Sequence, residues 1–376
     1  MNKQRPHPIT QNIKLLLASL IFCFFVIEIG YRLLDPFPYF SPSEINHTEH
    51  GNLSMYDATL GWRGVPSGET QFVTKNNSVW LAHNRQGFRD IEHDDLSEEK
   101  PAVVFLGDSF SWGYEVEFDE MFVNLLRGKF PSYEIFNLAH RGYGTDQALL
   151  TFKQWNDKRK LRLVVLMFSE NDVIDNNSEL RYEKSKPKFQ NIDNQLILTG
   201  IPVPKHEDWA SPPHSATANT TWKKSLKRLV FRSHLLHDVY VRYQQLRYRG
   251  DSTTQARPKR TPEEVRVRTD LTLTARILEE LRDHVVRQDS KLIVVFIPSK
   301  REIEELDDYL PYQLEVADMC EKLGIEHFDL APMFKSTWYR TYFRFGRHWN
   351  SRGHELAAKA LYKEFRTEGG PLAVAH

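Results

Sequence analysis

A short apolar stretch that ends in glycine constrains the fold of this chain more than any other feature. Residues 102–106 are rich in Val and Phe, and Gly107, Asp108 and Ser109 follow directly. A run of this length is typical of a buried parallel strand, and a glycine after it permits a sharp exit. The sequence therefore predicts a strand, a tight turn and a helix start. A serine there faces the positive end of a helix dipole and nearby backbone N–H groups, although Asp108 and Ser109 serving only as a helix cap is the simpler interpretation.

The strand signal recurs along the chain. Further strands are expected at residues 133–138, 163–168, 291–298 and 325–329. Helices are expected at residues 261–288, 299–309, 312–323 and 355–365. Alternation of this kind favours right-handed parallel crossovers. We therefore expect an α/β fold, a flavodoxin-like three-layer α/β/α sandwich with a five-stranded parallel sheet, whose ligand site lies beyond the carboxyl ends of the strands.

Three more polar blocks follow expected elements. A glycine-bearing loop, residues 139–144, follows the second strand, and residues 169–172, Ser-Glu-Asn-Asp, follow the third. Residues 347–350, Arg-His-Trp-Asn, stand near the C-terminus and are followed by Gly353 and His354. With the Gly-Asp-Ser block, these resemble in order the four blocks of the SGNH/GDSL hydrolase superfamily, membrane-anchored bacterial type. The resemblance is specific over residues 102–172 and 325–361.

The resemblance implies a serine hydrolase site with no metal and no organic cofactor. Ser109 would be the nucleophile, and His348 would be the general base and then the acid toward the leaving alcohol. The backbone N–H groups of Ser109 and Gly142 and the side-chain amide of Asn171 would form the oxyanion hole. Asp108 would be structural, and His354 is expected to open the last helix.

One position departs from the family pattern. The family places an aspartate two or three residues before the histidine, where this chain has Gly346 and Phe345. Without it, nothing nearby in sequence fixes the imidazole tautomer. We expect a Ser109–His348 dyad oriented by a backbone carbonyl or by a distant acid, for which the candidates are Asp172, Asp175 and Asp329.

The N-terminal segment predicts membrane attachment. Lys3, Arg5 and Lys14 precede an apolar run, and residues 13–34 have about the length that a bilayer-spanning helix needs. We favour an uncleaved single-pass anchor over a signal peptide, with residues 1–12 in the cytoplasm and the remainder in the periplasm, beyond the inner membrane.

The rest of the chain divides around the hydrolase-like part. Residues 35–100 form a lead-in in which Trp62, Phe88 and Arg89 lie in tracts that resemble membrane-anchored family members. These residues border the substrate site or, as we prefer, belong to a strap that covers a sheet edge. The hydrolase-like domain spans residues 101–368, with an insertion at residues 176–289, and residues 369–376 are a tail.

The insertion carries two expected features. A hairpin is predicted at residues 195–202. A basic amphipathic helix at residues 222–249 either contacts anionic lipid or polysaccharide or presents a solvated face.

Composition excludes some classes of function. Lys plus Arg equals Asp plus Glu, 50 each, so no nucleic-acid footprint is expected. Cys23 lies in the apolar segment, so a disulfide with Cys320 is not expected. Residues 107–113 lack the glycine-rich cradle and lysine of a nucleotide site.

We expect an extracytoplasmic O-acyl or O-acetyl esterase, or an acetyltransferase, acting on a cell-envelope carbohydrate through an acyl-serine intermediate. The alternative is a weakly catalytic glycan-binding partner of a membrane acyltransferase or polysaccharide exporter.

Overall fold

The computed structural model describes residues 8–40, 45, 53–93, 100–155, 157–205, 232–249, 271–304, 312–367 and 369–373. The chain divides into two compact units. The first comprises residues 1–45, 75–77 and 216–257, and the second comprises residues 46–74, 78–215 and 258–376.

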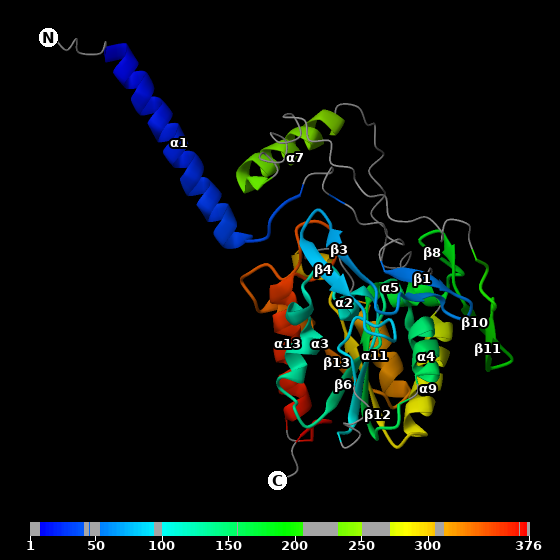
Figure 1. Cartoon of the computed structure of the whole chain (residues 1–376). Coiled ribbons are helices and arrows are strands. Elements are labelled where there is room, and N and C mark those ends of the chain that lie inside the picture. The colour runs from blue at the N-terminus through cyan, green and yellow to red at the C-terminus, as the bar shows by residue number, and fades with distance from the viewer. Residues whose placement is uncertain are drawn as a thin grey trace. The chain divides into compact units, whose positions relative to one another are not determined.

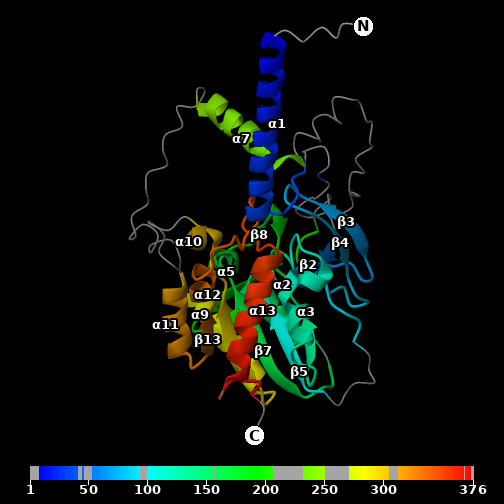
Figure 2. The same cartoon turned by 90° about the vertical axis from the view of Figure 1, so that its left-hand side faces the viewer.

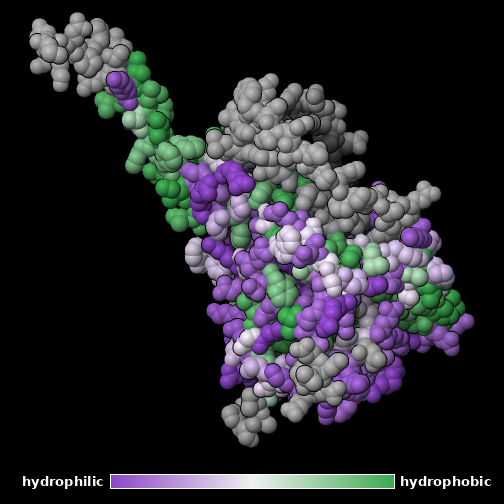
Figure 3. All heavy atoms as spheres, in the orientation of Figure 1, coloured by the Kyte–Doolittle hydropathy of each residue, from purple (hydrophilic) through white to green (hydrophobic). Residues whose placement is uncertain are grey.

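Two helices make up the described core of the first unit, α1 (Pro8–Leu34) and α7 (His234–Arg249). The span Asn12–Leu34 of α1 is long and apolar enough to cross a membrane, with a mean hydropathy of 2.3. Figure 3 shows its apolar side chains uncovered along the helix. The helix predicted at residues 222–249 is present from His234, and residues 222–231 lie outside the described part of the chain.

The Glu28 carboxylate of α1 joins these two helices. It accepts hydrogen bonds from Ser233 Oγ at 2.9 Å and from the backbone N–H groups of His234 and Leu235 at 3.1 and 3.0 Å. Backbone N–H groups in the first turn of a helix have no partner within the helix. A side chain of α1 therefore supplies the N-terminal acceptor of α7.

A five-stranded sheet organises the second unit (Figures 1 and 2). Its strands are β5 (Ala102–Leu106), β6 (Glu134–Asn137), β7 (Leu161–Phe168), β12 (Lys291–Phe296) and β13 (Glu326–Asp329). The order is β13-β12-β7-β5-β6, and every neighbouring pair is parallel. In chain order this is 2-1-3-4-5, the flavodoxin-like arrangement. The predicted fold class is confirmed.

Helices cover both faces of the sheet. Val104 and Leu106 of β5 pack toward α4 (Thr145–Gln154), α9 (Leu271–Val286) and α11 (Gln313–Lys322). Val103 and Phe105 point the other way, toward α3 (Phe122–Arg127), α12 (Ala331–Lys335) and α13 (Ser351–Arg366). Because the central strands β5, β7 and β12 are apolar on both sides, both faces must be buried, and a three-layer sandwich results.

Short elements complete the unit. The helical turns are α2 (Ser109–Trp112), η2 (Phe118–Glu120), α5 (Glu170–Asn176) and α10 (Lys300–Glu304). Four antiparallel ribbons pair β1 (Ser54–Asp57) with β2 (Gly61–Gly64), β3 (Glu69–Val73) with β4 (Ser78–Ala82), β8 (Leu180–Arg181) with β9 (Lys184–Ser185), and β10 (Lys188–Ile192) with β11 (Gln195–Thr199).

Some predicted boundaries were wrong. Asp193 and Asn194 form the turn of the β10–β11 hairpin, with φ of +50° and +63°, so the hairpin lies before and after them rather than at residues 195–202. The last helix begins at Ser351 and not at His354, because the Asn350 side chain caps it by accepting from the Gly353 N–H. The predicted helix start at residues 261–264 lies outside the described residues.

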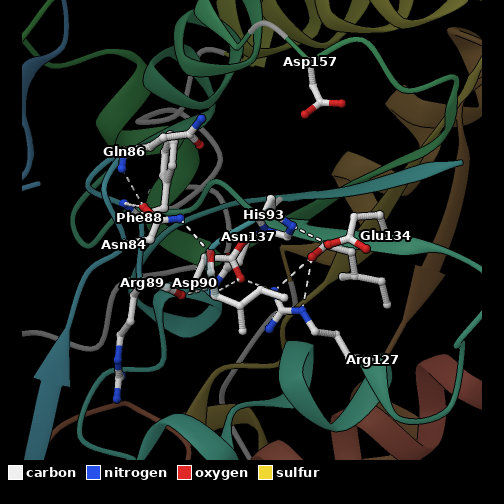
Figure 4. Close-up of polar contacts among 12 residues, drawn as sticks. Asn84, Gln86, Phe88, Arg89, Asp90, His93, Arg127, Glu134, Asn137 and Asp157 are labelled. Carbon is white, nitrogen blue, oxygen red and sulfur yellow. Dashed lines mark hydrogen bonds and ion pairs between the residues drawn. The ribbon is translucent and has the colours of Figure 1, made fainter. Parts of the chain in front are cut away.

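The lead-in holds the loop that follows β5, and Figure 4 shows two of its residues, Arg89 and Asp90, with Asp90 directed toward Asn137 and Arg127. Arg89 is 1% exposed, and its guanidinium donates hydrogen bonds to the carbonyls of Trp112, Gly113 and Val116. Its neighbour Asp90 accepts from the Asn137 N–H at 2.8 Å and from Arg127. Arg89 is therefore a structural residue of the lead-in, and it secures the loop after Ser109.

Replacement of Arg89 by leucine should strongly destabilise the protein. Three buried carbonyl groups would lose their donor, and each unsatisfied group costs about 1–3 kcal/mol, so the free energy of unfolding should fall by at least about 3 kcal/mol. Urea unfolding of Arg89→Leu measures this loss. The matched control is Arg85→Leu, which removes an exposed ion pair with Glu92 and should cost under about 1 kcal/mol. Equal losses in the two variants would contradict the role of Arg89 in holding the loop after Ser109.

Candidate active site

Ser109 lies at the carboxyl end of β5, at the first position of α2. Gly107 makes the exit from the strand with φ of +147°, and a Cβ there would come within 3.0 Å of the Met167 carbonyl oxygen. Asp108 caps the helix, because its carboxylate accepts from the Phe110 N–H at 2.9 Å. Ser109 is 9% exposed and therefore largely buried at this edge of the sheet.

His348 reaches Ser109 from the loop before α13. Lys300, at the start of α10, donates to the carbonyls of Phe343 and Arg344 at 2.6 and 2.7 Å. The backbone N–H of Phe343 in turn donates to the His348 carbonyl at 3.0 Å. A lysine ammonium therefore shapes the loop that carries the imidazole, and Gly346 within that loop has φ of +80°.

The structure brings the predicted nucleophile and base together. Ser109 Oγ lies 2.8 Å from His348 Nε2, across 239 positions of sequence. The imidazole lies against the rings of Tyr114 and Phe110, with centroids 4.2 and 5.3 Å away. Burial, with a smaller contribution from Arg347, lowers the pKa of His348 to about 3. The ring is therefore neutral near pH 7 and able to accept a proton.

Two backbone N–H groups lie free at this edge. Within the described chain, no hydrogen bond uses the N–H of Ser109 or of Gly142. Gly142 has φ of +75°, and a Cβ on it would lie 2.6 Å from the ring of Tyr182. Glycine is required at this position both by backbone conformation and by the aromatic ring beside it.

Asn171, the third predicted oxyanion donor, is engaged elsewhere. Its Nδ2 donates to Asp175 at 3.0 Å and to Asp108 at 3.4 Å, and its Oδ1 accepts from Ser169 at 3.0 Å. Both amide hydrogens therefore point at carboxylates in this structure.

Asp172 belongs to the same buried network. It accepts from Thr145 Oγ1 at 2.9 Å and from the Ser169 N–H at 2.8 Å. Burial, and then the neighbouring Asp108 carboxylate, raise the pKa of Asp172 well above its usual range. This network stabilises the residues beneath the site and does not orient the His348 imidazole.

None of the three candidate acids contacts His348. Asp175 pairs with Arg181 at 2.8 Å, and Asp329 accepts from the Ala331 N–H at 2.8 Å. Among the described residues, the carboxylate facing His348 is that of Glu115, whose Oε2 lies 4.0 Å from Nδ1. The expectation for Asp172, Asp175 and Asp329 is therefore corrected, since their partners hold them in other directions.

Sequence reasoning missed Glu115. Its side chain is 5% exposed and its φ is +68°. Glu115 stands only six positions after the nucleophile, in the stretch used to predict the strand and turn. A glutamate preceded by Gly113 and Tyr114 was the available signal, but it indicates no direction for the side chain.

The insertion also reaches the site. Tyr182 and Glu183 form the turn of the β8–β9 ribbon, both with positive φ, and the Tyr182 ring covers Gly142. The Arg181 guanidinium stacks on that ring at 4.6 Å. In the described part of the chain, no cluster of three or more His, Cys, Asp or Glu residues has the geometry to hold a metal ion.

Solved structures resemble this chain at low identity, whereas no protein-family model and no curated protein matches it. A lipolytic protein of the G-D-S-L family from Veillonella parvula is 12% identical, with a TM-score of 0.40, and the match covers 71% of this chain and 99% of that one. An acetyl xylan esterase is 13% identical, with a TM-score of 0.38 and coverage of 70% and 98%. The esterase EstA from Pseudoalteromonas is 10% identical, with a TM-score of 0.37 and coverage of 70% and 96%. The family name of the first is the one that the four sequence blocks resemble.

Replacement of Gly142 by alanine should impair both stability and activity. A non-glycine residue in this backbone region costs about 1–3 kcal/mol, and the new methyl group would displace Tyr182 or the loop. Loss of an oxyanion donor lowers the kcat of serine hydrolases by about 100- to 1,000-fold, and a similar loss is expected if Gly142 serves as such a donor and the loop moves. Turnover of p-nitrophenyl acetate and urea unfolding measure the two effects.

Gly324→Ala is the matched control for this variant. Gly324 has φ of +66° and nothing within 4 Å of a built Cβ, so alanine there adds the backbone strain without the clash. This control should lose stability and keep full activity. Full activity in Gly142→Ala together with a large loss of stability, which reports displacement of the loop, would contradict the assignment of its N–H to the oxyanion hole.

Proposed function

We propose that this chain is a serine ester hydrolase of the SGNH type. The observation that carries the proposal is the 2.8 Å contact between Ser109 Oγ and the Nε2 of a neutral His348. A serine hydroxyl that donates to an imidazole can pass its proton to that ring as it attacks a carbonyl carbon. Ser109 and His348 come from the first and the last of the four sequence blocks that resemble the family.

The proposed reaction has two halves. Ser109 Oγ bonds to the acyl carbon while its proton moves to His348 Nε2, and the N–H groups of Ser109 and Gly142 stabilise the oxyanion. Asn171 joins them only if one amide hydrogen leaves its 3.4 Å contact with Asp108. The leaving alkoxide takes the proton from Nε2, and an acyl-serine remains. Water then attacks the acyl carbon while one of its protons moves to Nε2. The bond between that carbon and Ser109 Oγ breaks, Oγ takes the proton back from Nε2, and the free acid leaves.

An O-acyl or O-acetyl group on a cell-envelope carbohydrate is the proposed substrate. The support is the resemblance to the membrane-anchored type, together with the half-buried Tyr182 beside Gly142, which offers an aromatic surface next to the reacting carbon. If a sugar hydroxyl replaces water in the second half, the same residues perform acetyl transfer. The proposed location is the outer face of the inner membrane, with α1 as the single anchor.

We further propose that α7 contacts anionic lipid. Within the first unit, its start is bonded to Glu28 near the C-terminal end of the membrane-spanning candidate. Leu236, Val239 and Tyr243 are exposed at helical spacing, and Arg232 and Arg242 are exposed as well. An apolar stripe flanked by cations is typical of a helix that lies in a lipid interface.

Labelling with a fluorophosphonate probe tests for an activated serine. The detergent-solubilised full chain should be labelled, Ser109→Ala should not react, and His348→Ala should react at least about 100-fold more slowly. Ser111→Ala is the matched serine control, because Ser111 is fully buried and lies on the same helix, and its hydroxyl has no hydrogen-bond partner among the described residues. An unlabelled but folded wild type would favour a glycan-binding partner that has lost catalysis.

The pH profile of kcat/KM tests the state of His348. The base must be neutral, and this form predominates above its pKa, which lies at about 3. Activity should therefore be retained well below pH 6.5, the ordinary value for histidine, and be lost only as the pH falls toward the lowered pKa. Rates of p-nitrophenyl acetate turnover between about pH 4.5 and 8, corrected for spontaneous hydrolysis, give the profile. A loss of activity centred at pH 6.5 or above would contradict the lowered pKa of His348.

A further inference from the structure

The imidazole of His348 needs an acceptor on the side away from Ser109. To take a proton at Nε2, the neutral ring must carry its hydrogen on Nδ1, and a group that accepts from Nδ1 fixes this tautomer and stabilises the imidazolium that forms. The loop before His348 offers Gly346 and Phe345 where the family has its acid. Among the described residues, the carboxylate oxygen within ion-pair distance of Nδ1 is Oε2 of Glu115, at 4.0 Å.

Glu115 is a buried residue with an unusual backbone conformation. Its φ of +68° places a residue with a Cβ in the left-handed region, where glycine is usual. Its side chain is 5% exposed. Strain of this kind persists only where the surroundings enforce it, and it gathers at functional sites.

The surroundings do enforce it. Arg89 donates to the carbonyls of Gly113 and Val116, which flank the segment, and the Val116 N–H donates to the Gly113 carbonyl at 3.4 Å. The Tyr114 ring lies against the imidazole, tilted by 31° from its plane. The turn that Arg89 holds therefore places the Tyr114 ring against His348 and the Glu115 carboxylate near its Nδ1 edge.

We propose that Glu115 is the positioning residue that orients His348, so that the serine loop supplies the acid which the histidine loop lacks. The inference rests on the proposed function of the Ser109–His348 pair. At 4.0 Å the contact is an ion-pair approach rather than a hydrogen bond, and such contacts commonly tighten when substrate binds. A movement of about 1 Å brings Oε2 within reach of the Nδ1 hydrogen.

Glu115→Gly separates the chemical role from a structural one. Glycine adopts a φ of +68° freely, so the free energy of unfolding should be unchanged or higher, whereas kcat for p-nitrophenyl acetate should fall about 10- to 1,000-fold. KM should change less than about threefold, because Glu115 acts through His348 and makes no contact with substrate. Glu115→Gln, which keeps the shape and removes the charge, should show the same loss in kcat.

Two further measurements complete the experiment on the solubilised full chain. Added formate should restore part of the kcat of Glu115→Gly, because a free carboxylate can occupy the vacated space, and should not restore Glu115→Gln. Asp289→Gly is the matched control, since Asp289 also has positive φ, at +53°, and its side chain is exposed at the opposite end of the strands. This variant should keep wild-type kcat with or without formate.

The outcomes separate the two proposals. A wild type that neither labels nor turns over overturns the proposed function and this inference together. An active wild type with a fully active Glu115→Gly overturns the inference alone. A large kcat loss without unfolding and with rescue by formate supports it, and a loss explained by unfolding, with no rescue, overturns it.

Discussion

A fully buried guanidinium, that of Arg89, holds the part of the molecule on which the candidate site depends. It lies over the Trp112 ring at 5.4 Å, and burial lowers its pKa to about 9, which still leaves it charged near neutrality. Three carbonyls of one turn accept hydrogen bonds from it in place of a carboxylate. A cation removed from water in this way tolerates little movement of its acceptors, so its hydrogen bonds favour this conformation of the turn after Ser109.

The insertion is joined to the site by charge. Asp146 forms a buried ion pair with Lys186, which also donates to the Asp175 carbonyl at 2.7 Å. Arg181, on β8, forms an ion pair with the Asp175 carboxylate. Burial raises the pKa of this carboxyl to about 6. Without these two cations, the carboxylates around Asn171 would repel one another in a region that water does not reach. The ribbons after α5 therefore belong to the support of the site.

Much of this arrangement could be predicted from sequence because it follows from local pattern. Buried strands have a recognisable length and composition, and parallel topology places the segments after them at one edge, which is why Ser109, Gly142 and Asn171 were expected together. Side-chain direction was not predictable in the same way. Asn171 donates to Asp175 because Arg181 holds that carboxylate in place, and Arg181 lies outside the four sequence blocks. Glu115 faces His348 because of a backbone conformation that few residues of its type adopt.

The space around Gly346 says something about how such a site changes over time. Nothing in the described structure lies within 4 Å of a Cβ built on this residue, and Lys300 holds the loop from its other side. A side chain gained there would meet no neighbour among the described residues, although at a φ of +80° it would strain the backbone. The acid and the base that it serves need not be neighbours in the chain, so a lineage can move the carboxylate from one loop to another while the Ser109–His348 pair stays where it is. Comparison of related sequences at positions 115 and 346 would then show exchange between the two, and a search that requires the acid beside the histidine would overlook proteins built in this way.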